Sequence, residues 1–323
     1  MQLDVECRKM YKPISMSLDV LIIGASGMAG KAFSKYFKSQ DKEVIGVSRH
    51  GPELFCDVEG DYITLHNYIL NNKPKYIINC AAEVSIEYCE AFPLKAFAIN
   101  SELVNELASS CAMVDSRFVH ISTDHYYLGE RRTLHSEEDT VEIVNTYAKS
   151  KYQGELNAKK YPGSIIIRTN ITGFRYNPEK QTFIEWLMEA LINKNKITLF
   201  KDFYTSTIDC GSFCELATKA ALTSYSGVLN IASSESLSKK EFALNIARRL
   251  GIDLDWANEG NVANLLPKRA NNLGLDCAKA EELISTRMPS GNEVARRLVD
   301  ESRMCENTLN KLKNENRIVI DRH

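Results

Sequence analysis

A tyrosine and a lysine, Tyr147 and Lys151, stand four residues apart in the stretch NTYAKSKYQGE, which is rich in good helix formers. Side chains at positions i and i+4 share one face of a helix, so both can point into the same cleft. A phenol has an ordinary pKa of about 10, but a neighbouring ammonium favours the phenolate and lowers that pKa. Such a phenol can protonate a carbonyl oxygen while a hydride arrives at the carbon. This spacing also occurs by chance in solvated helices. Whether the pair is catalytic therefore depends on the motifs in the rest of the chain.

A second polar group, Ser122-Thr123-Asp124, ends the apolar stretch RFVHI. Ligands of open α/β sheets bind beyond the carboxyl ends of the strands, so these side chains are expected beside the reacting carbonyl. The hydroxyl of Thr123 can hold the substrate oxygen by a hydrogen bond. Lys151 can also reach the nicotinamide ribose of a redox cofactor. We therefore predict that Thr123, Tyr147 and Lys151 are the catalytic residues.

A glycine-rich turn, GASGMAG, lies between an apolar run and a helical pattern, which is the context that a dinucleotide-binding motif requires. Glycines let the backbone turn tightly and approach a pyrophosphate, and a helix N-terminus offers free N–H groups and positive partial charge. The alternative is a tight turn with nothing bound. We assign to cofactor binding the turn residues Gly24, Ser26, Gly27, Met28 and Gly30.

The end of the second predicted strand indicates which dinucleotide is preferred. An acidic residue there would bond the ribose 2′-hydroxyl of NAD, but this strand ends in Ser48-Arg49-His50 and has none. The guanidinium of Arg49 can instead bind a 2′-phosphate in bidentate fashion. We therefore expect NADP(H) to be preferred, with NAD(H) as the alternative. Asp57, further on, is a candidate for binding the adenine amino group.

The elements that must position these residues alternate regularly. Short apolar strands and amphipathic helices follow one another five times, which is typical of an α/β fold with a doubly wound parallel sheet, the Rossmann arrangement. The expected strands are residues 18–24, 43–48, 75–82, 117–123 and 163–169, and the intervening helices are 27–39, 62–72, 93–112 and 145–160.

Beyond about residue 170 the alternation loosens, and we expect a smaller mixed α/β substrate domain. Helices are predicted at residues 183–195 and 210–224 and a strand at 227–233, and some strands of this region are expected to rejoin the main sheet. Ser238 and Glu241 form a capping-box pattern before another helix. The predicted organisation is a disordered leader at 1–17, a dinucleotide-binding domain at 18–169, a partly interleaved substrate domain at 170–300, and a polar tail at 301–323.

Composition limits the possible functions. The 323 residues carry a formal net charge of −2, so no broad basic field favours nucleic acid or an acidic membrane. No apolar run reaches the roughly 18 residues that would span a membrane, and the leader lacks the apolar core of an export signal. We therefore expect a cytoplasmic protein. The nine cysteines include no CxxC pair, and Cys210 and Cys214, four residues apart, have no second ligand pair to accompany them. We therefore predict neither a metal site nor a disulfide framework.

Two further residues have ordinary structural interpretations. Arg168 ends the fifth predicted strand and is interpreted mainly as an internal ion-pair partner, with phosphate binding as the alternative. Trp186 lies in an amphipathic helical pattern and is interpreted as a core residue rather than a stacking platform.

Taken together, the motifs resemble those of the extended short-chain dehydrogenases/reductases. The resemblance covers roughly residues 18–290 and rests on GASGMAG, NCAA at 79–82, Asn100, STD at 122–124, and YAKSK at 147–151. It implies that Ala81, Ala82 and Asn100 also lie on the cofactor side, although Asn100 can equally fix the backbone of its helix. Asn79 is interpreted as a turn residue near the cofactor.

Within that superfamily the chain most resembles the dTDP-4-dehydrorhamnose reductase group. The similar segments are IINCAAEVSIEYCEAFPLKAFAIN, HISTDHYYLG and PKRANNLGLDCAKAEEL. The resemblance implies NADPH-dependent reduction of the C4 ketone of a 4-keto-6-deoxy nucleotide sugar, by a protein that can form a homodimer. It also implies a set of substrate-side residues, namely Glu83, Asp124, His125, Arg269 and Asn272.

Departures from the family pattern fall around the substrate and leave alternatives open. His125 replaces the family's tyrosine, and it can either pack or act as an acid–base group. A nucleotide-sugar dehydratase would carry glutamate at this position, and an epimerase would be expected to retain NAD. The remaining alternative is a non-catalytic, NADP-binding protein that resembles the regulatory subunit of methionine adenosyltransferase.

Overall fold

The computed structural model describes residues 19–49, 54–56, 60–129, 132–177 and 179–304. The predicted leader at 1–17, the residue Asp57 and residues 305–323 of the predicted tail lie outside these ranges.

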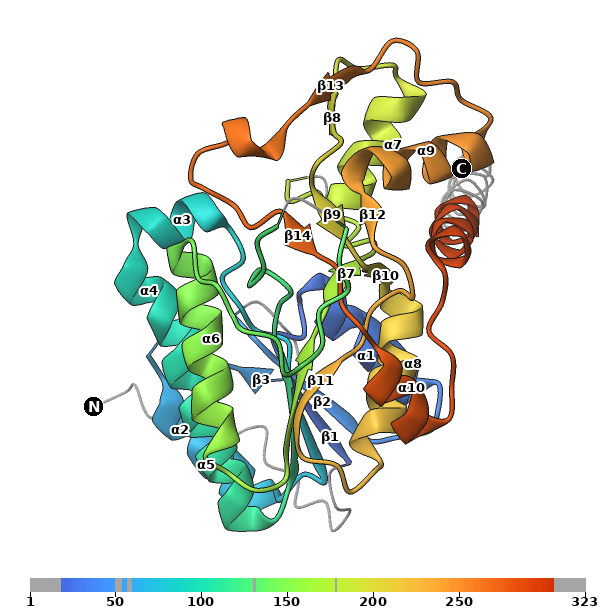
Figure 1. The fold of residues 1–323 in the computed structure, drawn as a ribbon. Coiled ribbons are helices and arrows are strands. Elements are labelled where there is room, and N and C mark those ends of the chain that lie inside the picture. Colours follow the sequence, from blue (N-terminus) through green and yellow to red (C-terminus); the bar gives the residue numbers. More distant parts are fainter. Residues whose placement is uncertain (1–18, 50–53, 57–59, 130–131, 178, 305–323) are drawn as a thin grey trace, which may run out of the picture.

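The described chain is organised around one parallel sheet of seven strands (Figure 1). Every neighbouring pair in it runs parallel. In spatial order the strands are β11 (Gly227–Asn230), β6 (Ser164–Arg168), β5 (Arg117–Ile121), β4 (Tyr76–Asn79), β1 (Val20–Ile23), β2 (Val44–Ser48) and β3 (Leu54–Phe55). The predicted doubly wound Rossmann sheet is confirmed, and the strand predicted at 227–233 joins it through β11.

Helices cover both faces of the sheet, as Figure 1 shows. One face carries α2 (Tyr62–Asn72), α5 (Leu103–Val114) and α6 (Thr146–Lys159), and the other carries α1 (Met28–Lys38), α8 (Cys210–Ala221) and α10 (Ala278–Ile284). Alternate residues of a strand point to opposite faces, so β1 sends Val20 and Ile22 into one core and Leu21 and Ile23 into the other. This is why its sequence is continuously apolar.

The helix predicted at 93–112 is present but irregular. It consists of α4 (Pro93–Phe97), a π-helical segment η2 (Ala98–Glu102) and α5, and it is preceded by the short helix α3 (Ile86–Ala91). The π segment packs across α6, where a Cβ at Gly154 would lie 2.2 Å from the carbonyl oxygen of Asn100. Only glycine therefore allows these two helices to approach so closely.

Whereas α8, β11 and α10 lie with the main sheet, part of the chain after residue 170 forms the smaller part at the top of Figure 1. Its core lies between α7 (Phe183–Ile192), α9 (Lys239–Leu250) and a helix at residues 291–304. Ser238 and Glu241 make the predicted capping box at the start of α9, and Gly251 closes that helix with φ of 71°.

The short strands of this part form small sheets beside the main one. They are β7 (Asn170–Thr172) with β10 (Thr207–Asp209), β12 (Leu237–Ser238) with β9 (Tyr204–Thr205) and β14 (Asn272–Leu273), and β8 (Thr198–Phe200) with β13 (Asn258–Gly260). A single 3₁₀ turn, η3 (Val262–Asn264), follows β13.

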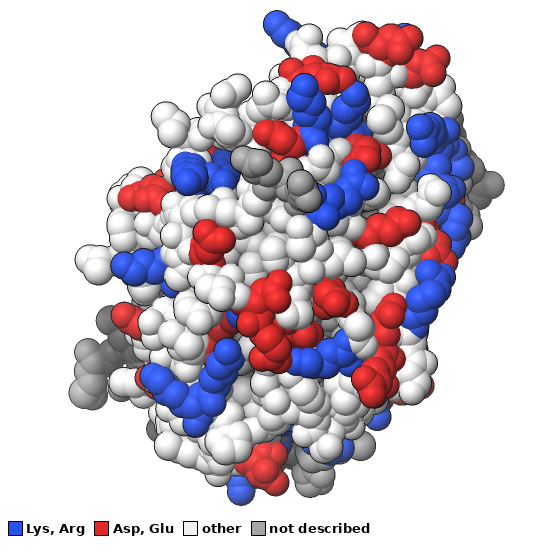
Figure 2. All heavy atoms as spheres, viewed as in Figure 1, with Lys and Arg blue, Asp and Glu red and all other residues white. Residues whose placement is uncertain are grey.

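Two properties of the surface bear on function. Lysines and arginines are interspersed with acidic residues over the face seen in Figure 2, without a broad field of one sign. In the described ranges no helix combines the length and the apolar character needed to cross a bilayer.

Candidate active site

A cleft of about 570 Å³ opens at the carboxyl ends of the sheet strands, between the two parts of the chain. Its walls combine the start of α1, the loops after β4 and β5, one face of α6, and residues from the C-terminal part. Of the sequence-predicted site residues, the cleft brings together Gly27, Met28, Ala82, Thr123, Asp124, His125, Tyr147, Lys151 and Arg269.

The three predicted catalytic residues lie on one wall of this cleft. Asn145 caps α6 by accepting a hydrogen bond from the Ala148 amide at 2.8 Å, which fixes the turn that carries Tyr147 and Lys151. The Tyr147 phenol and the Thr123 hydroxyl line the same wall, and the hydroxyl is close enough to lower the pKa of the phenol. The Lys151 ammonium donates to the carbonyl oxygen of Ile121, 2.7 Å away, at the end of β5. The loop after β5 and the helix α6 are thus joined at the reacting position.

The pKa of Tyr147 corrects one expectation from the sequence. Burial raises the pKa of this phenol, and the neighbouring Thr123 hydroxyl opposes the increase only in part. Burial also lowers the pKa of Lys151 to about 8. The charge of Lys151 alone predicts a lower pKa, but desolvation of the phenol outweighs it, so the predicted direction is wrong. Tyr147 is protonated at neutral pH and is equipped to donate a proton.

A fully buried ion pair lies directly beneath this wall. The Arg168 guanidinium donates to both carboxylate oxygens of Glu155, with its NH2 group 2.8 Å from Oε2. Glu155 also accepts from the Ser122 hydroxyl at 2.6 Å, and Arg168 donates to the Tyr127 hydroxyl at 2.8 Å. The prediction that Arg168 is an internal ion-pair partner is confirmed. The network joins β6, α6 and the Ser122-Thr123 turn.

The glycine-rich turn has the backbone that a pyrophosphate cradle requires. Gly24 has φ of 79°, and a Cβ on it would lie 2.7 Å from the Ala81 nitrogen. A Cβ on Gly30 would lie 2.3 Å from the carbonyl oxygen of Gly24. Gly27 is the N-cap of α1, and no side chain in the described chain caps that helix, so its first amides stay available. Ser26 is exposed in the turn, while Gly27 and Met28 line the cleft.

The loop after β4 is held by buried asparagines. Asn79 accepts a hydrogen bond from the Ala81 amide at 3.1 Å, consistent with its interpretation as a turn residue. Asn100, in the π segment, accepts from the Glu83 amide at 2.9 Å and donates to the Glu83 carbonyl oxygen at 3.0 Å. It also donates to the Ser150 hydroxyl at 3.0 Å. The structure therefore places Asn100 behind the loop, as a residue that positions it, and not on the cleft wall.

The residues predicted to select the dinucleotide lie at the edge of this region. Arg49 is exposed and directly follows β2. Ala82 lines the cleft, whereas the neighbouring Ala81 and Glu83 are partly buried in the same loop outside its lining. The Glu83 carboxylate accepts a hydrogen bond from the Ser85 amide at 2.9 Å, so it shapes the entrance to α3.

The predicted substrate residues separate into two groups. Asp124 and His125 line the cleft, as does Arg269, which pairs with Glu87 of α3. Asn272 lies in β14, is only 2% exposed, and accepts a hydrogen bond from the Thr133 amide at 3.1 Å. It does not line the cleft and instead supports the loop after β5.

The His125 ring lies edge-on to Tyr147, with ring centroids 5.5 Å apart, and edge-on to Phe203 at 6.4 Å. Burial lowers its pKa to about 3, so the imidazole is neutral. This environment fits the packing role that the sequence left open, because a neutral imidazole of this pKa cannot supply a proton at pH 7.

Several cleft residues were not predicted from the sequence. Lys239, the first residue of α9, lies with its ammonium 4.9 Å from the ring centre of Phe183 and 5.6 Å from that of Phe203. Arg175 and the hydroxyls of Thr169 and Thr172 also line the cleft. One signal was available: a lysine in the first turn of a helix opposes the helix dipole, and such local conflicts are concentrated at functional sites.

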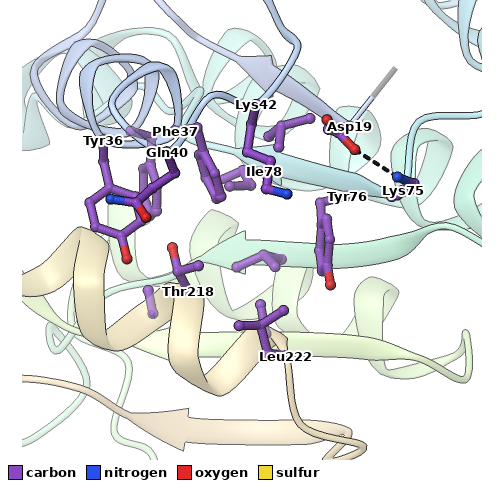
Figure 3. Close-up of a pocket in the computed structure, with 15 residues that line it drawn as sticks. Asp19, Tyr36, Phe37, Gln40, Lys42, Lys75, Tyr76, Ile78, Thr218 and Leu222 are labelled. Carbon is purple, nitrogen blue, oxygen red and sulfur yellow. Dashed lines mark hydrogen bonds and ion pairs between the residues drawn. The ribbon is translucent and has the colours of Figure 1, made fainter. Parts of the chain in front are cut away.

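A second cavity, of about 310 Å³, lies at the opposite, amino ends of β1 and β4 (Figure 3). Its interior is apolar, with Phe33 and Phe37 of α1 facing Ala217 and Ala221 of α8. Asp19 and Lys75 form an ion pair at its rim, 2.7 Å apart. In the described ranges no group of three or more histidine, cysteine or acidic side chains could hold a metal ion, and the seven cysteines there are free.

The chain was compared with known proteins. The family model described as RmlD substrate binding domain matches residues 18–304. The dTDP-4-dehydrorhamnose reductase of Sinorhizobium fredii is 26% identical over 276 residues, covering 80% of this chain and 89% of that protein. The methionine adenosyltransferase 2 subunit beta of Rattus norvegicus is 27% identical over 281 residues and 84% of each chain.

Solved structures agree with this fold. The crystal structure of dTDP-4-dehydrorhamnose reductase from Bacillus anthracis in complex with NADP superposes with a TM-score of 0.79 at 22% identity. The match covers 88% of this chain and all of that one, 100%. The arrangement of strands and helices around the cleft is therefore that of a known class of structures.

Proposed function

This chain belongs to the RmlD substrate binding domain family, and from that premise we propose that it reduces the C4 ketone of a 4-keto-6-deoxy nucleotide sugar with NADPH. The observation that carries the proposal is the meeting of Thr123, Tyr147 and Lys151 on one wall of a cleft. The amino end of α1, with its glycine turn, forms another wall of the same cleft. A reductase of this kind needs both walls in one cleft, so that the bound cofactor and the substrate lie next to each other.

The residues of this chain would bind and protonate the oxygen of the ketone. A bound nicotinamide would supply the hydride to the carbonyl carbon. Thr123 and Tyr147, which line the same wall of the cleft, would both donate to the carbonyl oxygen. As negative charge develops there, Tyr147 would transfer its proton to the oxygen, giving the alcohol and a phenolate. The Lys151 ammonium, held at the Ile121 carbonyl, would stabilise that phenolate until solvent reprotonates it.

Two features of the chain support a dinucleotide in this cleft. The backbone of Gly24 and Gly30 leaves no room for a Cβ, which fits a turn that closes tightly on a pyrophosphate. The uncapped start of α1 offers amide donors for phosphate oxygens. Arg49, exposed after β2, would bind the 2′-phosphate and give the preference for NADPH. The named relative from Bacillus anthracis binds NADP.

The proposal is tested by following the loss of reduced-nicotinamide absorbance with purified protein. NADPH and NADH are each combined with a panel of freshly prepared 4-keto-6-deoxy nucleotide sugars. We expect oxidation of NADPH with one sugar of the panel and slower oxidation of NADH. Replacement of Arg49 by alanine should weaken NADPH binding and leave NADH binding unchanged. Absence of turnover with every sugar would refute the reductase assignment.

A second candidate function is a regulatory, NADP-binding subunit, because a methionine adenosyltransferase subunit matches this chain as well as the reductase does. The full set of Thr123, Tyr147 and Lys151 in the cleft favours catalysis over this alternative. The same assay separates the two functions. Tight NADP binding without turnover, together with co-purification of a methionine adenosyltransferase catalytic subunit, would support regulation.

A further inference from the structure

An aspartate and a lysine from distant parts of the chain line the same cleft. Asp124 follows the catalytic Thr123, and Lys239 begins α9. The lysine is anchored by its backbone, whose amide donates to the Phe203 carbonyl oxygen at 3.0 Å, and its ammonium lies over the Phe183 and Phe203 rings. The stem and the rings thus aim the charge into the cleft.

The two charged groups influence each other without touching. Burial raises the pKa of Asp124 to about 7, and the positive charge of Lys239 opposes that increase. Burial lowers the pKa of Lys239 to about 8, and the negative charge of Asp124 opposes that decrease. Yet they form no direct ion pair within the described chain. Each of the two charges is therefore open to a group bound in the cleft.

Both groups have unused hydrogen-bonding capacity. Asp124 is 1% exposed, and its Oδ2 has no hydrogen-bond partner in the described chain. The Lys239 ammonium likewise has no acceptor among the side chains and carbonyls that the structure describes. A buried polar atom left without a partner is costly, so such atoms facing a cleft indicate a ligand that satisfies them.

Asn170 also lines the cleft beside Asp124 and helps to lower the pKa of that carboxyl, and its Oδ1 accepts a hydrogen bond from the Thr207 hydroxyl at 2.9 Å. Two further polar groups of this wall do not fill the same role as Asp124 and Lys239. His125 is neutral, and its Nε2 lies 3.9 Å from Asp124. Arg269 is already paired with Glu87 at the opposite rim. A ligand group that satisfies both Asp124 and Lys239 must accept a hydrogen bond from an ammonium and donate one to a carboxylate. A hydroxyl does both, whereas a methyl group does neither.

We propose that Asp124 and Lys239 together bind a hydroxyl on the sugar carbon next to the reacting carbonyl, with the hydroxyl donating to Asp124 and accepting from Lys239. The adjacent carbon follows from the chain, because Asp124 is bonded to Thr123, which holds the carbonyl oxygen. Lys239 is thereby a specificity-determining residue for an α-hydroxy ketone. This inference rests on the proposed reductase function and adds the recognised group to it.

The test compares two substrates and three variants. A 4-keto nucleotide sugar and its analogue lacking the hydroxyl next to the ketone are assayed with wild type, Lys239→Met, Lys239→Arg and Lys240→Met. Lys240 is the matched control, because it is the next residue of α9 and pairs with Glu259 on the surface. NADPH affinity is measured for each variant as a readout that the proposed role leaves unchanged.

We expect wild type to prefer the hydroxylated sugar by at least about 100-fold in kcat/KM, since a site built to hydrogen-bond a hydroxyl rejects an analogue without it. Lys239→Met should lose most of that preference, mainly through a higher KM for the hydroxylated sugar. Lys239→Arg should restore part of it, and Lys240→Met should behave as wild type. Equal losses for both sugars in Lys239→Met would show that Lys239 does not bind the hydroxyl and would overturn the proposal.

The same design separates this inference from the reductase proposal. If wild type turns over no keto sugar, binding of the corresponding sugar alcohol and its deoxy analogue is measured by calorimetry with NADP present. A preference for the alcohol that disappears in Lys239→Met would support the hydroxyl subsite although the reaction is different. Binding of neither sugar, or equal binding of both by wild type, would overturn it.

Discussion

The two cavities at opposite ends of the same strands each hold an aspartate and a lysine, and their surroundings move the pKa values in opposite directions. At the amino ends, the hydrogen bond between Asp19 and Lys75 lowers the pKa of the carboxyl and raises that of the ammonium, which favours the charged forms. At the carboxyl ends, burial raises the pKa of Asp124 and lowers that of Lys239, which favours the neutral forms. One pair is satisfied by its own contact, and the other is left to be satisfied by a ligand.

This difference follows from the architecture of a parallel sheet. The loops that carry reactive groups gather at the carboxyl ends of the strands, and groups held there without partners cost stability. The amino-end cavity is lined by core side chains from α1, α8 and the strands, with polar groups only at its rim. We therefore expect substitutions at the two ends to differ in kind, as the following experiments test.

The largest contrast is expected for two equivalent Tyr→Phe substitutions, one in each cavity. Tyr147→Phe removes the proposed proton donor, so kcat should fall by about 100-fold to 10,000-fold, the usual contribution of a general acid. NADPH affinity should remain nearly unchanged because the ring is kept. Steady-state kinetics and fluorescence titration with NADPH measure both quantities.

The control is Tyr36→Phe at the amino-end cavity, where the phenol contacts no proposed reactant. This variant should retain wild-type kinetics. Full activity of Tyr147→Phe would show that Tyr147 is not the proton donor. The two tyrosines would then not distinguish a catalytic cavity from a structural one.

The next contrast concerns two Glu→Gln substitutions and folding stability. Glu155 is 0% exposed and is held by Arg168, so Glu155→Gln leaves a buried guanidinium without its charge partner. We expect a loss of about 3–5 kcal/mol in the free energy of unfolding. Urea denaturation followed by circular dichroism measures it.

Glu215, on α8, is the matched position at the surface. It pairs with Lys219 at 2.9 Å, with the two side chains 47% and 40% exposed. Because exposed pairs contribute little, Glu215→Gln should cost less than about 0.5 kcal/mol. Equal effects of the two substitutions would show that the network beneath the cleft is not the rigid support we describe.

A smaller effect, of opposite sign, is expected when both charges of the cleft pair are removed. The Asp124→Asn, Lys239→Met double variant should be more stable than wild type by about 1–4 kcal/mol, because a buried and a partly buried charge without direct contact are replaced. It should also lose the preference for the hydroxylated sugar. Function and stability are thus opposed at this pair.

The pH dependence of that gain follows from the two pKa shifts. The folded pKa of Asp124, about 7, is above the reference value of 3.8, so its contribution to stability is present at low pH and is lost as pH rises through this range. The folded pKa of Lys239, about 8, is below 10.5, so its contribution is lost as pH falls from 10.5 to 8. The gain of the double variant should therefore be largest near pH 7.5 and smaller at pH 5 and pH 9.5.

The same measurement on Asp19→Asn, Lys75→Met provides the comparison. The pKa of Asp19 is lowered by Lys75, so that pair stabilises the fold at neutral pH and its contribution is lost as pH falls. This double variant should show no gain at any pH. A gain in stability of the Asp124→Asn, Lys239→Met variant that does not change with pH would contradict the pKa shifts of Asp124 and Lys239.

The parts of the fold that were predictable from the sequence are those set by local periodicity. The run LDVLIIG is continuously apolar because β1 is covered on both faces, and the capping box at Ser238 specified the start of α9. The π segment around Asn100 was missed, since nothing in AINSE distinguishes it from an α-helix. Trp186 was predicted to be in the core and is 43% exposed, because the face of α7 that the core covers does not include it.

The residues of the candidate site show the same difference between local motifs, which the sequence reveals, and contacts made by tertiary packing, which it does not. Thr123, Tyr147 and Lys151 lie in two segments close in sequence, each with a recognisable motif, and they meet in the cleft. Lys239 meets Asp124 only through tertiary packing, and it comes from a region of strands two or three residues long, without usable periodicity. The direction of the Tyr147 pKa was missed for a related reason, since burial is a property of the whole fold.

The smallest effect is expected from filling the amino-end cavity. Ala221 lies at its wall near the end of α8, and Ala221→Leu would add apolar side chain to a space already lined by Phe33 and Phe37. If the space is only imperfect packing, the substitution should stabilise the protein by about 1 kcal/mol without changing kcat/KM. Urea denaturation and the reductase assay measure the two outcomes. A fall in kcat/KM at unchanged stability would contradict the functional independence of the two cavities. It would mean that packing at the amino ends is coupled through β1 and β4 to the chemistry at the carboxyl ends.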